Sequence, residues 1–354
     1  LYSEAETELS EFAKKHNIPV TPTVMGVGCM DRDDPYYIGA IGCLGEGSSN
    51  SLSKETDMAL AVGTKLGDFT TGSWSNFHNP EFQLVSINTA RFDVTKHRAT
   101  PVISDAKIGL QQLSDALGDW KAPNTWYQRS IKERNEWDDY VEKQSGPTNQ
   151  ELPSYAHAVG AVYRNADPSD IVVTAAGGLV GEVVQIWKPK QINTFETEWG
   201  FSCMGYEISG ALGIKIAKPD NDIVVFIGDG SYLLQNSDIY SSVIYDKKLI
   251  IIVCDNSGHM VINRLQLAKG GEEYLCGLKT SRASNFIEVD FAAHAKSMGA
   301  ESETVTSTSE LEVAFKRAKE SKKTYVIAIK THGYEWLEGT AFWESPTLEV
   351  HTTD

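Results

Sequence analysis

Residues 222–231, with the sequence DIVVFIGDGS, decide the fold. A second apolar run, LIIIVCDN at residues 249–256, follows after a stretch at 238–245 with helical periodicity. Short apolar runs that alternate with helical stretches are typical of a parallel sheet with helices on both of its faces. The stretch therefore predicts an α/β fold with a doubly wound parallel sheet.

The same alternation extends over most of the chain. Strands are expected at residues 58–63, 83–88, 101–103, 170–174, 222–227, 249–254 and 325–330. Helices are expected at residues 2–15, 108–117, 155–163, 203–216, 238–245, 291–298 and 309–321. We therefore expect two doubly wound parallel-sheet domains.

The predicted domains cover residues 1–118 and 151–354, and a polar linker with some helix covers residues 119–150. The chain opens at Leu1 with a helical pattern that has no strand before it. An α/β domain normally opens with a strand, so we expect that the first strand of the first domain and the part of the protein before it are missing from this sequence.

Composition excludes several classes of partner. The formal net charge is −16, which argues against a nucleic-acid backbone as ligand, because such proteins need a basic face. No apolar run approaches the ~18 residues needed to span a membrane. The five cysteines show neither a CxxC pair nor zinc-ligand spacing. These features predict a cytoplasmic protein with neither a nucleic-acid nor a membrane partner.

Gly228, Asp229, Gly230 and Ser231 follow directly after an apolar run. In open α/β sheets, ligands bind beyond the carboxyl ends of the strands. Glycines allow close backbone approach to a phosphate, and a carboxylate offers Mg²⁺ a hard oxygen ligand. Taken alone, this segment is equally compatible with a plain turn at the end of a strand.

Asn256 ends the next apolar run. Adjacent parallel strands joined by one helix place their carboxyl ends side by side, so we expect Asp229 and Asn256 to face one ligand. The backbone carbonyl of Gly258 could add a third oxygen. Asp229, Asn256 and Gly258, with two phosphate oxygens and a water, would complete an octahedral Mg²⁺ shell.

The glycine–aspartate–glycine segment followed by Asp255-Asn256 resembles the motif of the thiamine-diphosphate-dependent enzymes of the acetolactate-synthase-like superfamily. Phe201–Tyr206 (FSCMGY) is similar to the Gly-x-Met-Gly-Phe segment of that superfamily. The resemblance implies that Met204 lies beneath the cofactor and holds its bent shape. It also implies that the Ser202 carbonyl accepts a hydrogen bond from the 4′-amino group of the pyrimidine. Taken alone, Met204 is also compatible with ordinary helix packing.

Residues 176–179 (AGGL) resemble the other loop that contacts the diphosphate in this fold, although a plain turn is equally compatible with them alone. By this resemblance the cofactors are thiamine diphosphate and Mg²⁺. The residues expected to bind the cofactor are Ala176, Gly177, Gly178, Leu179, Ser202, Met204, Gly228, Asp229, Gly230, Ser231, Asn256 and Gly258.

The first predicted domain resembles the central domain of the same superfamily. The similar pieces occur in the expected order at residues 18–23, 38–40, 61–64 and 105–106. The superfamily allows FAD in this domain, but no residue here requires it. A nicotinamide dehydrogenase is disfavoured because Gly26-Val27-Gly28 lacks the third glycine and the acidic partner of a dinucleotide fingerprint.

Several segments resemble, within the superfamily, the hydrolases of inositol catabolism that open a cyclic diketone. They are residues 68–71, 96–97, 198–207 (EWGFSCMGYE), 228–232 and 262–266 (INRLQ). This resemblance implies hydrolytic cleavage of a C–C bond in a small cyclic diketone, which yields a deoxyglucuronate. His259, behind the Asn256 loop, could reach the substrate or be an ordinary loop histidine.

The alternatives are an acetolactate-synthase-type carboligase, which would share every cofactor residue, and a non-catalytic or split cofactor-binding subunit. In the superfamily, the glutamate that activates the cofactor lies on a separate N-terminal domain that no segment here resembles. The catalytic residue is therefore unknown. The superfamily builds its site between two chains, which implies a homodimer or homotetramer.

Overall fold

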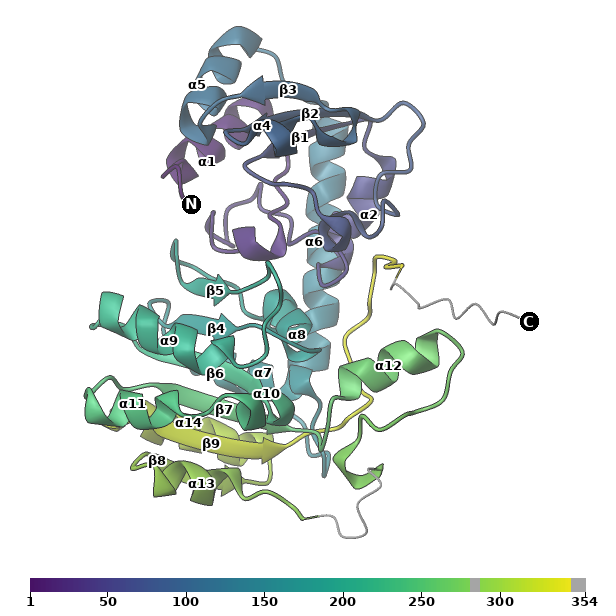
Figure 1. Cartoon of the computed structure of the whole chain (residues 1–354). Coiled ribbons are helices and arrows are strands. Elements are labelled where there is room, and N and C mark those ends of the chain that lie inside the picture. Colours follow the sequence, from purple (N-terminus) through teal and green to yellow (C-terminus); the bar gives the residue numbers. More distant parts are fainter. Residues whose placement is uncertain (281–286, 345–354) are drawn as a thin grey trace.

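The computed structural model describes residues 1–280 and 287–344. Two α/β parts lie one above the other, and one long helix runs alongside both of them (Figure 1). Each part has its own parallel sheet. The larger part holds the segments that decide the fold, and the smaller part comes first in the chain.

Six parallel strands form the larger sheet, in the order β5-β4-β6-β7-β9-β8. Their bounds are β4 Ile171–Thr174, β5 Phe195–Thr197, β6 Ile223–Gly228, β7 Ile250–Asp255, β8 Glu301–Val305 and β9 Tyr325–Lys330. Strands β6 and β7 are direct neighbours, and Gly228 pairs with Cys254. The loops that follow these two strands therefore begin side by side.

Helices cover both faces of this sheet. They are α7 Tyr155–Tyr163, α8 Leu179–Ile186, α9 Tyr206–Ala217, α10 Asp229–Leu234, α11 Asp238–Ile244, α13 Phe291–Ser297 and α14 Thr308–Glu320. Helix α12 Met260–Ala268 lies to one side of the sheet (Figure 1), and a 3-10 turn η3 lies at Leu278–Thr280. Ile250 and Ile252 join one buried cluster with residues of α7, α8 and α14. Ile251 and Val253 join a second cluster with residues of α9, α11 and α13. Because successive side chains of a strand point to opposite faces, both faces need apolar residues, and the expected doubly wound sheet is confirmed.

The smaller part has a three-stranded parallel sheet in the order β1-β2-β3. Its elements are β1 Met58–Val62, β2 Gln83–Asn88, β3 Thr100–Ile103, α1 Glu6–His16, α2 Gly47–Glu55, α3 Asp68–Thr71, α4 Arg91–Val94 and α5 Ala106–Leu117, with 3-10 turns η1 Val24–Gly26 and η2 Lys96–Arg98. Helix α5 packs on β2, and α1 packs on α5. The Asp105 side chain accepts hydrogen bonds from two backbone N–H groups at the start of α5, which fixes where this helix begins.

The stretch expected as a linker with some helix is mostly a single helix, α6 Asn124–Ser145, of 22 residues. It packs against α2 in the smaller part and against α7 and α8 in the larger part (Figure 1). Gly47 permits this close approach, because an added Cβ there would lie 2.4 Å from the Trp137 ring. The two parts are thus joined by a packed element rather than by an extended polar chain.

Residues 331–344 run back from β9 past the larger part to the smaller one (Figure 1). Leu337 N–H donates to Glu182 on α8 at 2.9 Å, and Asn50 on α2 donates to the Thr340 hydroxyl at 2.7 Å. This segment therefore provides a second connection between the two parts. Within the described residues, no helix combines the length and the apolar character that crossing a membrane requires.

Candidate functional site

Three loops meet at the carboxyl edge of the larger sheet. They follow β4, β6 and β7, which are consecutive in the strand order. The Asp229 carboxylate joins two of these loops, because its Oδ2 accepts a hydrogen bond of 2.7 Å from the Gly258 N–H. The structure thus brings together Asp229, Asn256 and Gly258, as the pairing of the two strands leads one to expect.

Asp229 is buried, with 1% of its surface exposed. Burial, together with the nearby Asp255 carboxylate, raises the pKa of Asp229 to about 7, and the N–H groups of Gly258 and Gly230 partly oppose this shift. Asp255 itself is paired with Lys330 at 2.5 Å. A divalent cation beside Asp229 would favour its ionised form by direct attraction.

Asn256 has one satisfied and one unsatisfied amide atom. Its Nδ2 donates to the hydroxyl of Tyr155 at 2.8 Å. Its Oδ1 is buried and has no hydrogen-bond partner among residues 1–280 and 287–344. A buried, unpaired oxygen destabilises a fold by about 1–3 kcal/mol, and a hard cation would satisfy it. The residues present therefore fit a Mg²⁺ ion held by a carboxylate and neutral oxygens.

In the described parts of the chain, no group of three or more His, Cys, Asp or Glu side chains is placed to hold a metal ion. The candidate site does not form such a group, because Asp229 is its only carboxylate ligand. An amide oxygen from Asn256 and a backbone carbonyl from Gly258 would supply the other protein ligands.

Gly230 lies where the β6 loop meets Met204 and His259. A Cβ added at Gly230 would lie 2.5 Å from the His259 ring and 3.4 Å from the Met204 methyl group. Only glycine fits here without displacing a neighbour. Met204, predicted from the FSCMGY segment, therefore lies beside the predicted diphosphate loop, and 36% of its surface remains exposed.

The segment that carries Ser202 and Met204 differs from its expected conformation. Helix α9 begins at Tyr206, whereas a helix was expected from Cys203. Ser202 and Gly205 both have a positive φ, of 51° and 94°, which is incompatible with a continuing helix. The Ser202 hydroxyl donates to the Ala175 carbonyl at 3.0 Å, so this loop is joined to the end of β4.

Glu207 was not predicted as a site residue, yet it lies between three of the four predicted cofactor segments. Its Oε2 accepts the Gly205 N–H at 2.8 Å. Burial raises the pKa of Glu207, and hydrogen bonds from Gly205, Ser231 and Ala176 act in the opposite direction. The one sequence signal was an acidic residue in the first turn of a helix otherwise rich in small and apolar residues.

The predicted loop at residues 176–179 ends where α8 begins, at Leu179. Gly177 has a φ of +76°, which favours glycine. Trp336, from the returning segment 331–344, covers Gly178 so closely that an added Cβ would lie 2.0 Å from its ring. The Trp336 ring also meets the Tyr155 ring edge-on at 5.5 Å, and the Arg264 guanidinium lies 5.3 Å from it.

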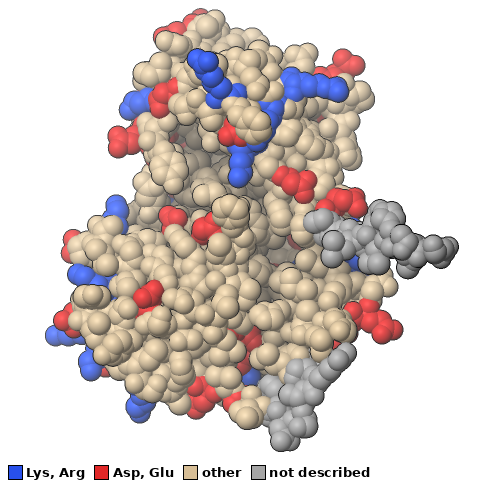
Figure 2. Space-filling view, in the orientation of Figure 1, with Lys and Arg blue, Asp and Glu red and all other residues tan. Residues whose placement is uncertain are grey.

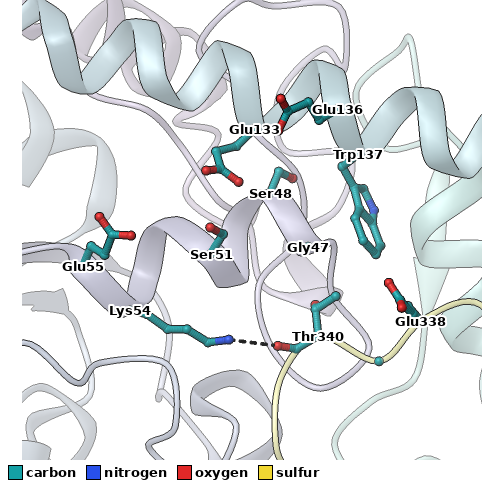
Figure 3. Close-up of a pocket in the computed structure, with 11 residues that line it drawn as sticks. Gly47, Ser48, Ser51, Lys54, Glu55, Glu133, Glu136, Trp137, Glu338 and Thr340 are labelled. Carbon is teal, nitrogen blue, oxygen red and sulfur yellow. Dashed lines mark hydrogen bonds between the residues drawn. The ribbon is translucent and has the colours of Figure 1, made fainter.

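A cavity of about 550 Å³ lies elsewhere, between α2, α6 and residues 338–340 (Figure 3). It is lined by one lysine and several glutamates, and Lys54 donates to the Thr340 carbonyl at 3.3 Å. None of the predicted cofactor residues lines it. The cavity therefore lies away from the predicted cofactor residues, which are at the carboxyl edge of the larger sheet.

Curated relatives match along almost the whole chain. It is similar to the 3D-(3,5/4)-trihydroxycyclohexane-1,2-dione hydrolase of Geobacillus thermodenitrificans, with 32% identity over 100% of this chain and 59% of the relative. The enzyme of that name from Lacticaseibacillus casei is 32% identical, over 99% of this chain and 58% of its own length. A Bacillus cereus relative, 3D-(3,5/4)-trihydroxycyclohexane-1,2-dione hydrolase 1, is 34% identical, over 96% of this chain and 59% of its own length. The chain therefore spans about 59% of the length of these relatives.

Two family models match the two α/β parts. The central domain of thiamine pyrophosphate enzymes matches residues 1–113, and their C-terminal TPP binding domain matches residues 175–329. The second match includes the loops after β4, β6 and β7, where the predicted cofactor residues lie. The resemblance read from the sequence is confirmed: the chain belongs to the thiamine pyrophosphate enzyme family.

Proposed function

We propose that this protein is a thiamine-diphosphate- and Mg²⁺-dependent hydrolase that opens the ring of a cyclic trihydroxy-dione. The observation that carries the cofactor part is the buried Oδ1 of Asn256, which has no partner among the described residues, together with the buried Asp229 carboxylate at the end of the neighbouring strand. Both lie at the carboxyl edge of the sheet, where an α/β fold binds its ligands.

In this proposal Asp229, Asn256 and the Gly258 carbonyl hold Mg²⁺, and the ion binds the diphosphate. Gly177 and Gly230 let the backbone approach the phosphate oxygens, because a side chain at either position would be strained or would collide with a neighbour. Glu207 joins these segments, because it accepts the Gly205 N–H and its carboxylate lies near Ser231 and Ala176. In this proposal the chain supplies the metal- and diphosphate-binding part of the cofactor site.

When bound, thiamine diphosphate supplies a nucleophilic carbon and an electron sink for cleaving a C–C bond next to a carbonyl. The chain's own residues orient that group. Met204 lies beside Gly230 and is placed to support the cofactor from one side. The His259 ring lies against the same glycine, and in this proposal it reaches the substrate.

The substrate is proposed from the relatives, whose names specify a trihydroxycyclohexane-dione as the compound hydrolysed. Identity of 32–34% extends over nearly the whole chain. Addition of water across the broken ring bond would give an open-chain product, a deoxyglucuronate, in inositol catabolism.

The partner is proposed to be a second copy of this chain, in a homodimer or homotetramer. Helices α9, α10 and α11 cover one face of the larger sheet, and Figure 2 shows few charged side chains over the middle of this part. Large apolar residues lie exposed there and in the adjoining loop: Phe201, Leu233, Leu234, Tyr240, Ile244 and Tyr245. In a protein of net charge −16, an exposed apolar face beside the site is suited to cover by another chain.

A substrate assay tests the proposed reaction. The full-length enzyme, with Mg²⁺ and thiamine diphosphate, is incubated separately with the trihydroxycyclohexane-dione and with pyruvate. We expect consumption of the dione with formation of an open-chain acid, and no acetolactate from pyruvate. Acetolactate without dione consumption would instead assign the protein to the carboligases, and turnover that persists in Asp229→Ala would contradict the cofactor assignment.

A further inference from the structure

Tyr155 is the only described side chain that hydrogen-bonds to the Asn256 amide, through the 2.8 Å contact from Nδ2 to its hydroxyl. Its phenol lies 3.8 Å from the position of an added Cβ at Gly228, the residue before Asp229. Tyr155 thus lies beneath both strand ends that carry the proposed metal ligands. It comes from α7, which precedes those strands by many residues in the chain.

An asparagine amide has two different ends, and only its oxygen can bind a cation. Nothing in the length or charge of the side chain decides which end faces the metal. A hydroxyl can accept from the nitrogen or donate to the oxygen, and where it accepts from the nitrogen the oxygen points the other way. In this structure the nitrogen is paired with Tyr155, and the buried Oδ1 is left without a partner among the described residues.

We propose that Tyr155 is a positioning residue: its hydroxyl holds the Asn256 nitrogen and so presents Oδ1 to Mg²⁺. This inference rests on the proposed function, since it concerns the same metal site. Hydrogen-bond partners of metal ligands commonly tune affinity in this way, by fixing the orientation of a ligand that could otherwise rotate.

Tyr155 is itself held rigidly. It is the first residue of α7, and the Ser154 side chain caps that helix by accepting the His157 N–H. The ring is buried and packs edge-on against Trp336 at 5.5 Å and 81°. A fixed phenol limits the freedom of the amide that it contacts, so the Asn256 side chain is held in place at the end of its strand.

The test is Tyr155→Phe, which keeps the ring and removes the hydroxyl. The measurement is the affinity for Mn²⁺ or Mg²⁺ at saturating thiamine diphosphate, by calorimetry or by paramagnetic resonance of Mn²⁺. We expect affinity to fall about 10- to 100-fold. Tyr163→Phe is the matched control: it removes another hydroxyl from the same helix, one that contacts the Lys188 carbonyl at 3.4 Å. It should leave metal affinity unchanged.

Asn256→Asp separates positioning from general damage to the fold. A carboxylate has two equivalent oxygens, so its orientation need not be selected. Tyr155→Phe should therefore cost much less metal affinity in the Asn256→Asp background than in the native one. An equal cost in both backgrounds, or native affinity in Tyr155→Phe, would overturn the proposal.

Failure of the metal site itself would look different. If Asp229→Ala still binds the metal with native affinity, then the proposed function is wrong. If Asp229→Ala loses the metal while Tyr155→Phe binds it normally, only the role given to Tyr155 is wrong.

Discussion

Among single residues, Glu182 combines burial with incomplete hydrogen bonding. Its Oε1 accepts the Leu337 N–H, whereas Oε2 is buried without a partner in the described parts of the chain. Burial raises the pKa of Glu182 to about 7 from an ordinary value of 4.5, and the Leu337 N–H and the Arg264 charge only partly oppose it. The folded state therefore holds this proton to a higher pH than the unfolded state does.

We predict that Glu182 makes the fold less stable as pH rises from about 4.5 to about 7, after which its effect levels off. Glu182→Gln removes this titration and keeps an acceptor for Leu337. As pH rises from 5 to 8, the difference in unfolding free energy between the variant and the native protein should change by up to about 3 kcal/mol in favour of the variant. Urea unfolding at the two pH values measures it. If the difference in unfolding free energy between the variant and the native protein is the same at pH 5 and pH 8, the prediction is wrong.

Asp229, Asn256 and Gly258 could be predicted because each follows an apolar run, and neighbouring parallel strands end together. Tyr155 and Trp336 could not, because they reach the site from α7 and from residues 331–344, and the sequence has no signal for such long-range packing. The positions of the cofactor residues around a ligand stay predictions.

At the scale of elements, α6 is anchored to the smaller part by a buried cluster of charges. Arg32 pairs with Glu46 at 3.0 Å and with Asp138 of α6 at 2.7 Å, and the Arg32 and Glu46 side chains are only 3% and 2% exposed. Burial raises the pKa of Glu46, and the Arg32 charge acts to lower it. The ionised form of Glu46 at this buried position therefore depends on the positive charge of Arg32.

Arg32→Ala should destabilise the protein by about 3–5 kcal/mol, because it leaves Glu46 buried without its cation. Arg129→Ala is the control, since its pair with Glu55 at 2.7 Å is 40% and 53% exposed. That loss should cost at most about 1 kcal/mol. Thermal or urea unfolding of both variants provides the measurement, and an equal, small effect of the two changes would show that the buried pair does not anchor α6.

Elements with a clear pattern were the ones that sequence could predict. Helix α7 and strands β2 and β9 agree with their expected bounds. Strand β8, Glu301–Val305, lies at the edge of the sheet and is polar, so it lacked an apolar run. Helices α8 and α12 were not predicted, because they begin directly at the ends of the predicted cofactor loops, at Leu179 and Met260.

At the scale of the whole molecule, the exposed apolar face over α9, α10 and α11 predicts self-association. Leu234, at the end of α10, is 64% exposed, so Leu234→Glu should leave the fold of one chain nearly unchanged. We expect the variant to shift toward a smaller assembly in light scattering. Phe92→Glu, at a position on α4 that is 76% exposed, should keep the native mass. Native mass for Leu234→Glu would contradict this role of the face.

The overall α/β architecture and the family were predictable because they depend on local alternation and on short motifs. The way α6 and residues 331–344 join the two parts was not, since both stretches are irregular in hydrophobicity and gain their order from partners distant in the sequence. The domain boundaries at residues 118 and 151 stay predictions.

The central claim is that the loops after β4, β6 and β7 bind thiamine diphosphate through Mg²⁺ held by Asp229 and its neighbours. Calorimetric titration of thiamine diphosphate into the protein, with Mg²⁺ present or chelated, tests it most directly. We predict that binding requires Mg²⁺ and is abolished in Asp229→Ala, whereas Asp119→Ala, at an exposed position, binds as the native protein does. Metal-dependent binding of native affinity in Asp229→Ala would contradict the account.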